Sequence, residues 1–558
     1  MAQSTEADWV ARFADDVIAE AGRRAPGKKI TVASGISPSG PIHLGNLREI
    51  MVPHLVADEI KRRGVPCEHI LSWDDFDRYR KVPAGYDPSY AEHIGKPLTA
   101  VPAPEGSAYA TWSDHFKAPF REALAALGVE VTEISQTVEY TSGTYREQIL
   151  HAMRERHRID EVLGRYRTKK KAGGEEQGEE PDDDASLEQA PEYFPYKPYC
   201  SACGKDLTTV VAYDDDTTEL TYECQACGNR ETVRLSEFDN GKLVWKVDWP
   251  MRWAFKGVDF EPSGVDHQSP GSSWMVGQQL VREIFGAEPP IGPMYAFVGI
   301  SGMAKMSSSK GGVPIAADAL SIMEPQLLRW LYARRRPNQA FNISFGDEIS
   351  RTYDEWDALE RKVAEGTAAP VDVAVHSRAA RTASGELPTT GHKLPYRTLA
   401  SVVDITTGDE EQTLRILRDL DQERPLASLD DARPRLDCAE HWVNTHVEPE
   451  ARTRVRTEPD AAALAALSGE EREALKLLVD GLPEHWSLDG LTTLVYGVPK
   501  MQAGFAPDAK PTPELKAAQR SFFALLYNLL VGRDTGPRLP TLLLAVGQER
   551  VRELLAAS

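Results

Sequence analysis

The hydrophobic positions near the N-terminus follow first the spacing of a strand and then that of a helix. Residues 28–36 (KKITVASGI) are rich in β-branched side chains and predict a buried strand. Apolar residues then recur every three or four positions through 43–64, which predicts an amphipathic helix. Residues 66–75 (PCEHILSWDD) predict a second buried strand. These elements form a right-handed crossover unit of a parallel sheet, in which ligands lie at the carboxyl ends of the strands, here near 35–45 and 73–77.

The pattern changes twice further along the chain. A short β-rich and turn-rich stretch at 196–235 interrupts the α/β pattern, which then resumes. After about residue 320 the spacing is helical almost throughout. We therefore expect an α/β, Rossmann-like parallel-sheet catalytic domain at 1–320, with an insertion at 160–240, and an all-α domain at 321–558. The clearest helical examples are MEPQLLRWLYARRR, YDEWDALERKVAEG, EEREALKLLVDGL and PELKAAQRSFFALLYNLLVG.

Composition narrows the class of protein. The 558 residues are 41% hydrophobic and 27% charged, which excludes collagen, a wholly disordered chain and a small disulfide scaffold. No stretch approaches the roughly 20 apolar residues of a membrane helix, and the N-terminus lacks the features of a secretory signal. We therefore expect a cytoplasmic protein without membrane contact. The net charge of −21 argues against non-specific coating of nucleic acid but allows a local basic surface. The acidic run at 173–189 predicts a solvated, disordered loop.

The first candidate site is the segment SPSGPIHLGN at 37–46, directly after the first predicted strand. Its glycines and prolines form a turn that ends at a helix N-terminus, where free amides and the helix dipole favour an anion. His43 and Asn46 would face that anion, and Gly45 would let a base or phosphate approach the backbone. The alternative is a tight turn before a surface helix, with His43 as an incidental cap.

The second candidate site is the segment KMSSSKGG at 305–312. Two lysines, three hydroxyls and two glycines make a donor-rich loop suited to a polyphosphate whose charge grows on the leaving group. The alternative is a flexible polar linker. The segment lacks the glycine spacing of a Walker A loop, so ordinary NTPase chemistry is not indicated.

The third candidate site is a pair of CxxC sequences, Cys200/Cys203 and Cys224/Cys227. Their spacing suits a closed, tetrahedral structural zinc site with S–Zn distances of about 2.3 Å. A redox CxxC or two disulfides are the alternatives. Four thiolates leave no open position on the metal, so the site is not expected to do chemistry.

The first two segments together resemble the HIGH and KMSKS signatures of the class I aminoacyl-tRNA synthetases. Several further stretches resemble, within that family, the class I lysyl-tRNA synthetases. The resemblance covers most of the chain and is weakest between about 350 and 510. The stretches that carry it are 33–50, 72–83, 243–269, 295–311, 331–346 and 536–555.

This resemblance implies an enzyme that activates lysine with ATP to lysyl-adenylate and transfers it to the 3′-terminal ribose of tRNA(Lys), releasing AMP and pyrophosphate. It also implies a helical domain that binds the tRNA anticodon, Mg²⁺ with the ATP, and a monomer. Catalytic roles are implied for His43, Asn46, Lys305 and Lys310. Because Ser308 replaces the second lysine of the general signature, which lysine serves the transition state stays open. The implied ATP-binding residues are Pro38, His43, Gly45, Asn46, Lys305, Met306, Ser307, Ser308, Ser309 and Lys310.

The resemblance also implies a lysine pocket. Aromatic walls suit lysine's four methylenes, and a carboxylate must receive the ammonium because an unpaired buried cation is costly. Asp74 or Asp75 is the candidate carboxylate, whereas Trp249 and Trp253 are expected to be core residues. The other implied pocket residues are Gly35, Ser37, Trp245, His267 and Tyr295.

Three other functions are each consistent with part of this sequence pattern. One is a class I synthetase for glutamate, whose pocket would need a cation where Asp74 and Asp75 stand. Another is a synthetase that aminoacylates something other than tRNA, which would not need the long helical half. The third is a non-catalytic zinc-ribbon protein that binds nucleic acid, which leaves the two phosphate-handling segments unexplained.

Overall fold

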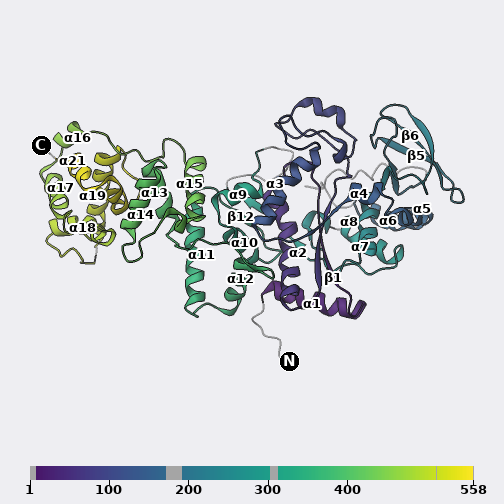
Figure 1. Ribbon diagram of the computed structural model, residues 1–558, viewed down its shortest axis with the longest axis horizontal. Coiled ribbons are helices and arrows are strands. Elements are labelled where there is room, and N and C mark those ends of the chain that lie inside the picture. Colours follow the sequence, from purple (N-terminus) through teal and green to yellow (C-terminus); the bar gives the residue numbers. More distant parts are fainter. Residues whose placement is uncertain (1–7, 171–191, 270, 302–311, 511, 557–558) are drawn as a thin grey trace. The chain divides into compact units, whose positions relative to one another are not determined.

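The computed structural model divides the chain into two compact units (Figure 1). The first unit holds residues 1–320, 325–344 and 359–387, and the second holds 321–324, 345–358 and 388–558. The acidic run at 173–189 and the segment 305–310 lie outside the described residues. The described residues are 8–170, 192–269, 271–301, 312–510 and 512–556.

A parallel sheet lies at the centre of the first unit. Strands β1 (Ile30–Ile36), β2 (Cys67–Trp73) and β3 (Thr132–Ser135) are hydrogen-bonded in the order β1-β2-β3. On the other side of β1, isolated parallel bridges join Val32 to Phe260 and Phe260 to Ile291. The strand order therefore reverses beside β1, which is where open α/β sheets bind ligands. The expected Rossmann-like architecture is confirmed.

Helix α2 (Leu44–Arg62) connects β1 to β2, as the hydrophobic spacing predicted. It begins after His43, its N-cap, and ends one residue before the cap Arg63, so that the chain turns at Gly64 with φ of +74°. Leu47, Ile50 and Met51 are fully buried. Burial of this apolar face fixes both the helix and the ends of β1 and β2 that face the site.

The remaining elements of the parallel-sheet unit surround this centre (Figure 1). Helices α1 and α2 pack together, as do α7 and α8. The helices are α1 (Trp9–Arg24), η1 (Pro88–His93), η2 (Leu98–Ala100), α3 (Trp112–Ala126), α4 (Gln136–Thr141), α5 (Arg146–Arg154), α6 (Arg156–Lys170), α7 (Trp245–Lys256), η4 (Val265–His267), α8 (Ser273–Glu283), α9 (Ala316–Ile322), α10 (Pro325–Ala333) and α12 (Pro370–Ala380). The short strands are β9 (Ser263–Gly264) and β10 (Met294–Tyr295), which pair in parallel, and β13 (Arg381–Thr382) and β14 (Gly385–Glu386), which form a hairpin.

The cysteine-bearing stretch is an antiparallel β-structure. Strands β5 (Thr208–Tyr213), β6 (Glu219–Cys224) and β7 (Arg230–Arg234) form one sheet, and β4 (Tyr196–Pro198) pairs with β8 (Gly241–Leu243). Alternate residues of β6, such as Leu220 and Tyr222, are buried in a core shared with α5–α8. Burial of every second residue is expected for an antiparallel strand that is covered on one face only.

The second unit is helical in its described residues (Figure 1). Leucines of its last six helices share one core. No described helix is long and apolar enough to cross a membrane. The helices are α11 (Glu348–Ala364), whose C-terminal part belongs to the first unit, α13 (Tyr396–Thr406), α14 (Glu410–Leu420), η6 (Leu429–Ala432), α15 (Arg435–His446), α16 (Ala461–Ala465), α17 (Gly469–Gly481), α18 (Leu488–Gln502), α19 (Pro513–Val531), α20 (Leu539–Val546) and α21 (Gln548–Leu555).

Some residues beyond 320 belong to the parallel-sheet unit. Strand β12 (Phe341–Ile343) pairs in parallel with β11 (Val298–Ile300). The fully buried Arg329 of α10 donates to the ring of His54 and to the carbonyl oxygens of Leu127 and Arg378. These hydrogen bonds, to residues far away in the sequence, hold α10 in the parallel-sheet unit. Hydrophobic spacing predicts only that a segment is helical, so it could not assign α10 to this unit.

Candidate active site and metal centre

The turn after β1 holds His43 at the start of α2. The Nδ1 atom of His43 accepts the backbone N–H of Asn46 (3.4 Å), and the Asn46 side chain accepts the backbone N–H of His43 (3.3 Å). Burial lowers the pKa of His43 to about 4, so the ring is neutral near pH 7. Because Nδ1 is an acceptor, the single ring proton belongs on Nε2, which remains a donor.

The same turn is bonded to the chain that follows the lysine-rich loop. The backbone N–H of Leu44 donates to the carbonyl of Pro314 (3.1 Å), and His43 forms a β-bridge with Ile315. The indole of Trp112 donates to the Ser39 carbonyl (3.0 Å) and holds the turn on its other side. The predicted residues Lys305, Met306, Ser307, Ser308, Ser309 and Lys310 lie outside the described residues.

A partly buried carboxyl group, that of Glu49, lies beside the end of β1. It is hydrogen-bonded to the backbone N–H of Gly35 and to the Tyr295 hydroxyl. Burial, followed by the negative charges of Asp74 and Glu261, raises the pKa of Glu49 to about 8. Sequence reasoning missed Glu49, although it lies three residues after Asn46 and so shares a helix face with it.

Asp74 lies against the same glycine. A Cβ atom on Gly35 would be 3.5 Å from Asp74 Oδ2, while Asp74 Oδ1 accepts from Arg252 (2.6 Å). Burial raises the pKa of Asp74 to about 6, although the charge of Arg252 opposes the shift. Asp75 has other partners, because it accepts from Lys117 (2.7 Å), the Ser135 hydroxyl (2.7 Å) and the Thr137 amide (2.8 Å). Of the two predicted aspartates, Asp74 is therefore the one beside Gly35.

Aromatic rings from α7 and its neighbours lie next to these carboxyl groups. Trp245 stacks on Trp249 with ring centroids 5.0 Å apart, and His267 packs edge-on to Trp249 at 5.6 Å. The indole N–H groups of Trp249 and Trp253 donate to the two oxygens of Glu261 (3.0 and 2.7 Å). Trp249 and Trp253 are buried in a hydrophobic cluster, as the sequence predicted.

The predicted pocket residues lie on converging elements. Gly35 is in β1, Ser37 and Pro38 follow it, and Gly45 is in the first turn of α2. Tyr295 in β10 is paired with Gly264 of β9, and a Cβ on Gly264 would lie 3.5 Å from the Tyr295 ring. The absence of a side chain at Gly264 therefore lets the ring pack directly on the strand.

This pocket is short of positive charge. Lys242 and Arg252 form ion pairs with three of five clustered carboxyl groups, and the charge of Arg80 also acts on one of the three. Burial raises the pKa of Glu261 to about 7, even though its two indole partners oppose the shift. The pKa values of Glu49, Asp74 and Glu261 are raised, whereas Lys242 holds the pKa of Asp77 below its usual value although burial opposes this. The three raised values indicate acids that the protein leaves undercompensated, so a cationic ligand is favoured here. The carboxyl groups are Glu49, Asp74, Asp77, Asp248 and Glu261.

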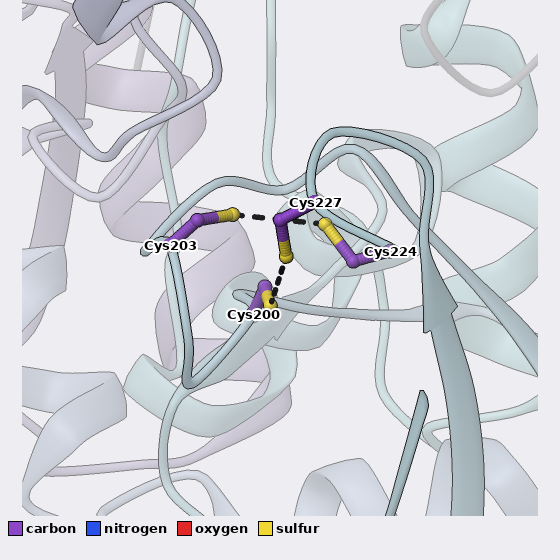
Figure 2. Close-up of side chains that lie close together, drawn as sticks. All are labelled: Cys200, Cys203, Cys224 and Cys227. Carbon is purple, nitrogen blue, oxygen red and sulfur yellow. Dashed lines mark hydrogen bonds between the residues drawn. The ribbon is translucent and has the colours of Figure 1, made fainter. Parts of the chain in front are cut away.

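The four cysteines of the β-insertion meet at one point (Figure 2). All four Sγ atoms lie within 4.8 Å of one another, with 3.7 Å between Cys200 and Cys227 and 3.6 Å between Cys203 and Cys224. A tetrahedron with metal–sulfur distances of about 2.3 Å has edges of about 3.8 Å, so the donor set fits a metal such as zinc. A disulfide would instead need sulfurs about 2.05 Å apart.

These features define a class I aminoacyl-tRNA synthetase. Residues 7–384 match the family model described as "tRNA synthetases class I (K)", and the chain belongs to this family. It is 67% identical to the lysine–tRNA ligase of Streptomyces coelicolor over 100% of this chain and 99% of that protein. Lysine–tRNA ligases of Thermococcus kodakarensis (32% identity; 97% of this chain, 98% of that protein) and Treponema pallidum (31%; 98% of each) are also similar.

Proposed function

We propose that this chain is a lysine–tRNA ligase that forms lysyl-adenylate from lysine and ATP and transfers the lysyl group to the 3′-terminal ribose of tRNA(Lys). The observation that carries the assignment is the 67% identity to a lysine–tRNA ligase along the whole chain. In the first step the lysine carboxylate attacks the α-phosphate and the bond to pyrophosphate breaks. In the second step the ribose hydroxyl attacks the adenylate carbonyl and AMP leaves.

The acid-rich pocket supports lysine as the amino acid. We assign the lysine ammonium to Glu49, assisted by Asp74 and the Tyr295 hydroxyl, beside Gly35. Trp245 and His267 would line the methylenes, since aromatic rings pack an alkyl stem and tolerate a nearby cation. A glutamate side chain would add a carboxylate to a cluster already rich in acid, so this rival is disfavoured.

The turn at the start of α2 supports ATP binding at the carboxyl end of β1. The neutral ring of His43 would donate from Nε2 to a phosphate oxygen, and Asn46 and Gly45 would line the same helix end. Lys305 and Lys310 would neutralise charge on the departing pyrophosphate, with Mg²⁺ on the phosphates. The reaction needs no covalent enzyme intermediate, so these groups act by position and charge.

Pyrophosphate exchange tests this assignment. With ATP and labelled pyrophosphate, exchange should depend on lysine, measured both without and with saturating tRNA(Lys). Glutamate should not replace lysine. Exchange that depends on glutamate, or on no amino acid, would refute the proposal.

The His43 assignment needs a variant that separates chemistry from helix capping. His43→Asn retains a good N-cap but removes the ring donor, whereas His43→Ala removes both. We expect His43→Asn to lower the rate of lysine-dependent exchange by roughly 10²–10³-fold, the effect of losing one preorganised donor. Its thermal midpoint should stay near that of the wild type. Normal exchange by a folded His43→Asn protein would rule out this role.

We also propose that Cys200, Cys203, Cys224 and Cys227 hold one structural zinc ion. A closed tetrathiolate site contributes folding energy and leaves no position for substrate. Metal analysis should give about one zinc per chain, and Cys203→Ser should lower both zinc content and thermal midpoint. A matched Cys67→Ser variant, outside the cluster, should retain the metal. Zinc-free protein with normal stability would contradict the proposal.

A further inference from the structure

The carboxyl end of β2 continues into a turn at residues 74–77, the pocket turn, which carries two acids of the pocket, Asp74 and Asp77. The Asp77 amide donates to the Asp74 carbonyl (3.3 Å), so the positions of the two acids are linked. Phe76, between them, is buried. Three contacts hold the pocket turn, or the chain that follows it, against the β-insertion at residues 196–243.

The first contact comes from Tyr199, which directly precedes the first cysteine of the cluster. Its hydroxyl donates to the Phe76 carbonyl, and its ring packs on the Phe76 ring with centroids 5.0 Å apart. Both side chains are buried, so these contacts are shielded from water. A buried carbonyl that loses its donor is costly, and this bond therefore favours one position of the pocket turn.

The second contact comes from Lys242 of β8, whose ammonium forms an ion pair with Asp77. Strand β8 pairs in antiparallel fashion with β4, the strand that leads into Tyr199. The Tyr199 amide extends this pairing by donating to the Asn240 carbonyl (2.8 Å). One short ladder therefore presents both Lys242 and Tyr199 to the same turn.

The third contact comes from the loop that follows the first CxxC pair. The Asp206 amide donates to the Gly95 carbonyl (2.8 Å), and the Gly95 amide donates to the Tyr79 carbonyl (2.9 Å). A Cβ on Gly95 would lie 3.2 Å from the Lys205 Cβ, so the loop packs directly on this glycine. The Cys200 amide donates to the Lys205 carbonyl (2.9 Å), which ties the loop back to the cysteine cluster.

The cysteine cluster lies next to the origin of these contacts. Cys200 directly follows Tyr199, and its Sγ atom is 3.7 Å from that of Cys227 (Figure 2). A metal bound by the four thiolates would fix the backbone at Cys200, because it would join the two CxxC loops at one point. The same metal would thereby fix Tyr199 and the loop that contacts Gly95.

We propose that Tyr199 is a positioning residue for lysine, because it holds the pocket turn so that the Asp74 carboxyl stays beside Gly35. Through Tyr199, zinc content and lysine affinity are coupled. This proposal rests on the proposed function in taking lysine as the ligand. It adds a role for the β-insertion in amino-acid recognition besides its own folding. ATP would bind at the start of α2, on different elements, so the effect falls on lysine.

Tyr199→Phe tests the proposal because it keeps the ring and removes only the hydroxyl. In pyrophosphate exchange at saturating tRNA(Lys), KM for lysine should rise about tenfold, the scale of one lost buried hydrogen bond. KM for ATP and kcat should stay within about twofold of the wild type. Tyr196→Phe is the matched control, because Tyr196 is equally buried in β4 and its hydroxyl has no hydrogen-bond partner among the described residues. Both variants should retain zinc.

Hydrogen exchange followed by mass spectrometry measures the hold on the turn directly. In Tyr199→Phe the amides of residues 74–79 should exchange about tenfold faster than in the wild type, and those of the control should not change. Cys203→Ser, assayed below its thermal midpoint, should show the same faster exchange and a raised KM for lysine. A residue that served stability alone would lower the thermal midpoint without this selective change in KM.

The two measurements separate the possible failures. If the wild type shows no lysine-dependent pyrophosphate exchange, the proposed function fails, but hydrogen exchange still tests whether Tyr199 holds the turn. Unchanged hydrogen exchange at residues 74–79 in Tyr199→Phe would overturn the proposal. An unchanged KM for lysine in folded Tyr199→Phe, or an equal rise in KM for ATP, would also overturn it. Zinc-free, folded Cys203→Ser with the wild-type KM for lysine would overturn the coupling to the metal.

Discussion

Helix α2 carries two glutamates whose surroundings are opposite. Glu49 lies beside the carboxyl end of β1, and burial together with neighbouring carboxylates raises its pKa to about 8. Glu59, ten residues later, accepts from Arg378 (2.6 Å) and from Arg63 (2.8 Å). Burial alone would raise the pKa of Glu59, but the hydrogen bonds and charges of these arginines outweigh burial and hold the pKa below its ordinary value.

The opposite pKa shifts distinguish an acid held in a structural ion pair, Glu59, from an acid that the fold leaves without a cation, Glu49. Arg378 also bonds both oxygens of the buried Asp8, so the acids at that end are satisfied by the protein itself. At the other end the protein provides fewer cations than carboxyl groups. A buried acid that the fold leaves undercompensated is costly unless a ligand supplies the missing charge. In the function proposed above, one helix thus serves stability at one end and lysine recognition at the other.

The largest expected effect is a loss of stability, and it comes from removing the arginine that pairs with the acids near Glu59. Arg378→Met should lower the free energy of unfolding by about 3–5 kcal/mol, because it leaves the buried Asp8 without its cation and leaves Glu59 with Arg63 alone. Denaturant titration measures this change. The exposed Arg381→Met is the matched control and should change stability by less than about 0.5 kcal/mol. A loss in Arg378→Met no larger than in the control would show that Arg378 is not needed to compensate these acids.

Removing the charge of Glu49 should have a smaller effect, on activity and on the pH dependence of stability. Glu49→Gln should lower kcat/KM for lysine in pyrophosphate exchange by roughly 10²-fold or more, because a buried ammonium loses its charged partner. Glu59→Gln, on the same helix, should leave kcat/KM near the wild-type value.

The two variants should also differ in pH dependence. A raised folded pKa favours the folded state below about pH 4.5, and this contribution is lost as pH rises toward 8. The stability of Glu49→Gln relative to wild type should therefore increase over that interval. Glu59 has a lowered pKa, so its contribution is present above pH 4.5 and is lost as pH falls. A falling relative stability of Glu49→Gln with rising pH would contradict the assigned direction.

The smallest effect concerns proton exchange with the ligand. If Glu49 is protonated in the free protein near pH 7 and receives an ammonium when lysine binds, binding must release a proton. Lysine affinity should then rise with pH between about 6 and 8, by at most about tenfold per unit. Calorimetry in buffers of different ionisation enthalpy counts the protons. Proton uptake, or no pH dependence, would exclude Glu49 as the titrating partner.

Sequence patterns predicted the features that depend on neighbouring residues. The spacing of β1, α2 and β2 and the two CxxC pairs are local, and the structure has each where the pattern indicated. The pairing of Asp74 with Arg252 joins residues 178 positions apart, and no periodicity could reveal it. Glu49 was missed because the groups that raise its pKa, Asp74 and Glu261, are distant from it in the sequence. Strand β12 is three residues long, too short to stand out from the helical pattern around it.

The position of β1 between β2 and Phe260 sets an order of events during synthesis. Chain elongation adds about 5–20 residues per second, so roughly 10–45 s pass between the synthesis of β1 and that of Phe260. Throughout that interval one edge of β1 has no partner from its own chain and can pair with another nascent chain. Glu261 and Tyr295, which complete the acid-rich pocket, arrive later still. The sheet and the acid-rich pocket can therefore be completed only after more than half of the chain, through Tyr295, has been made.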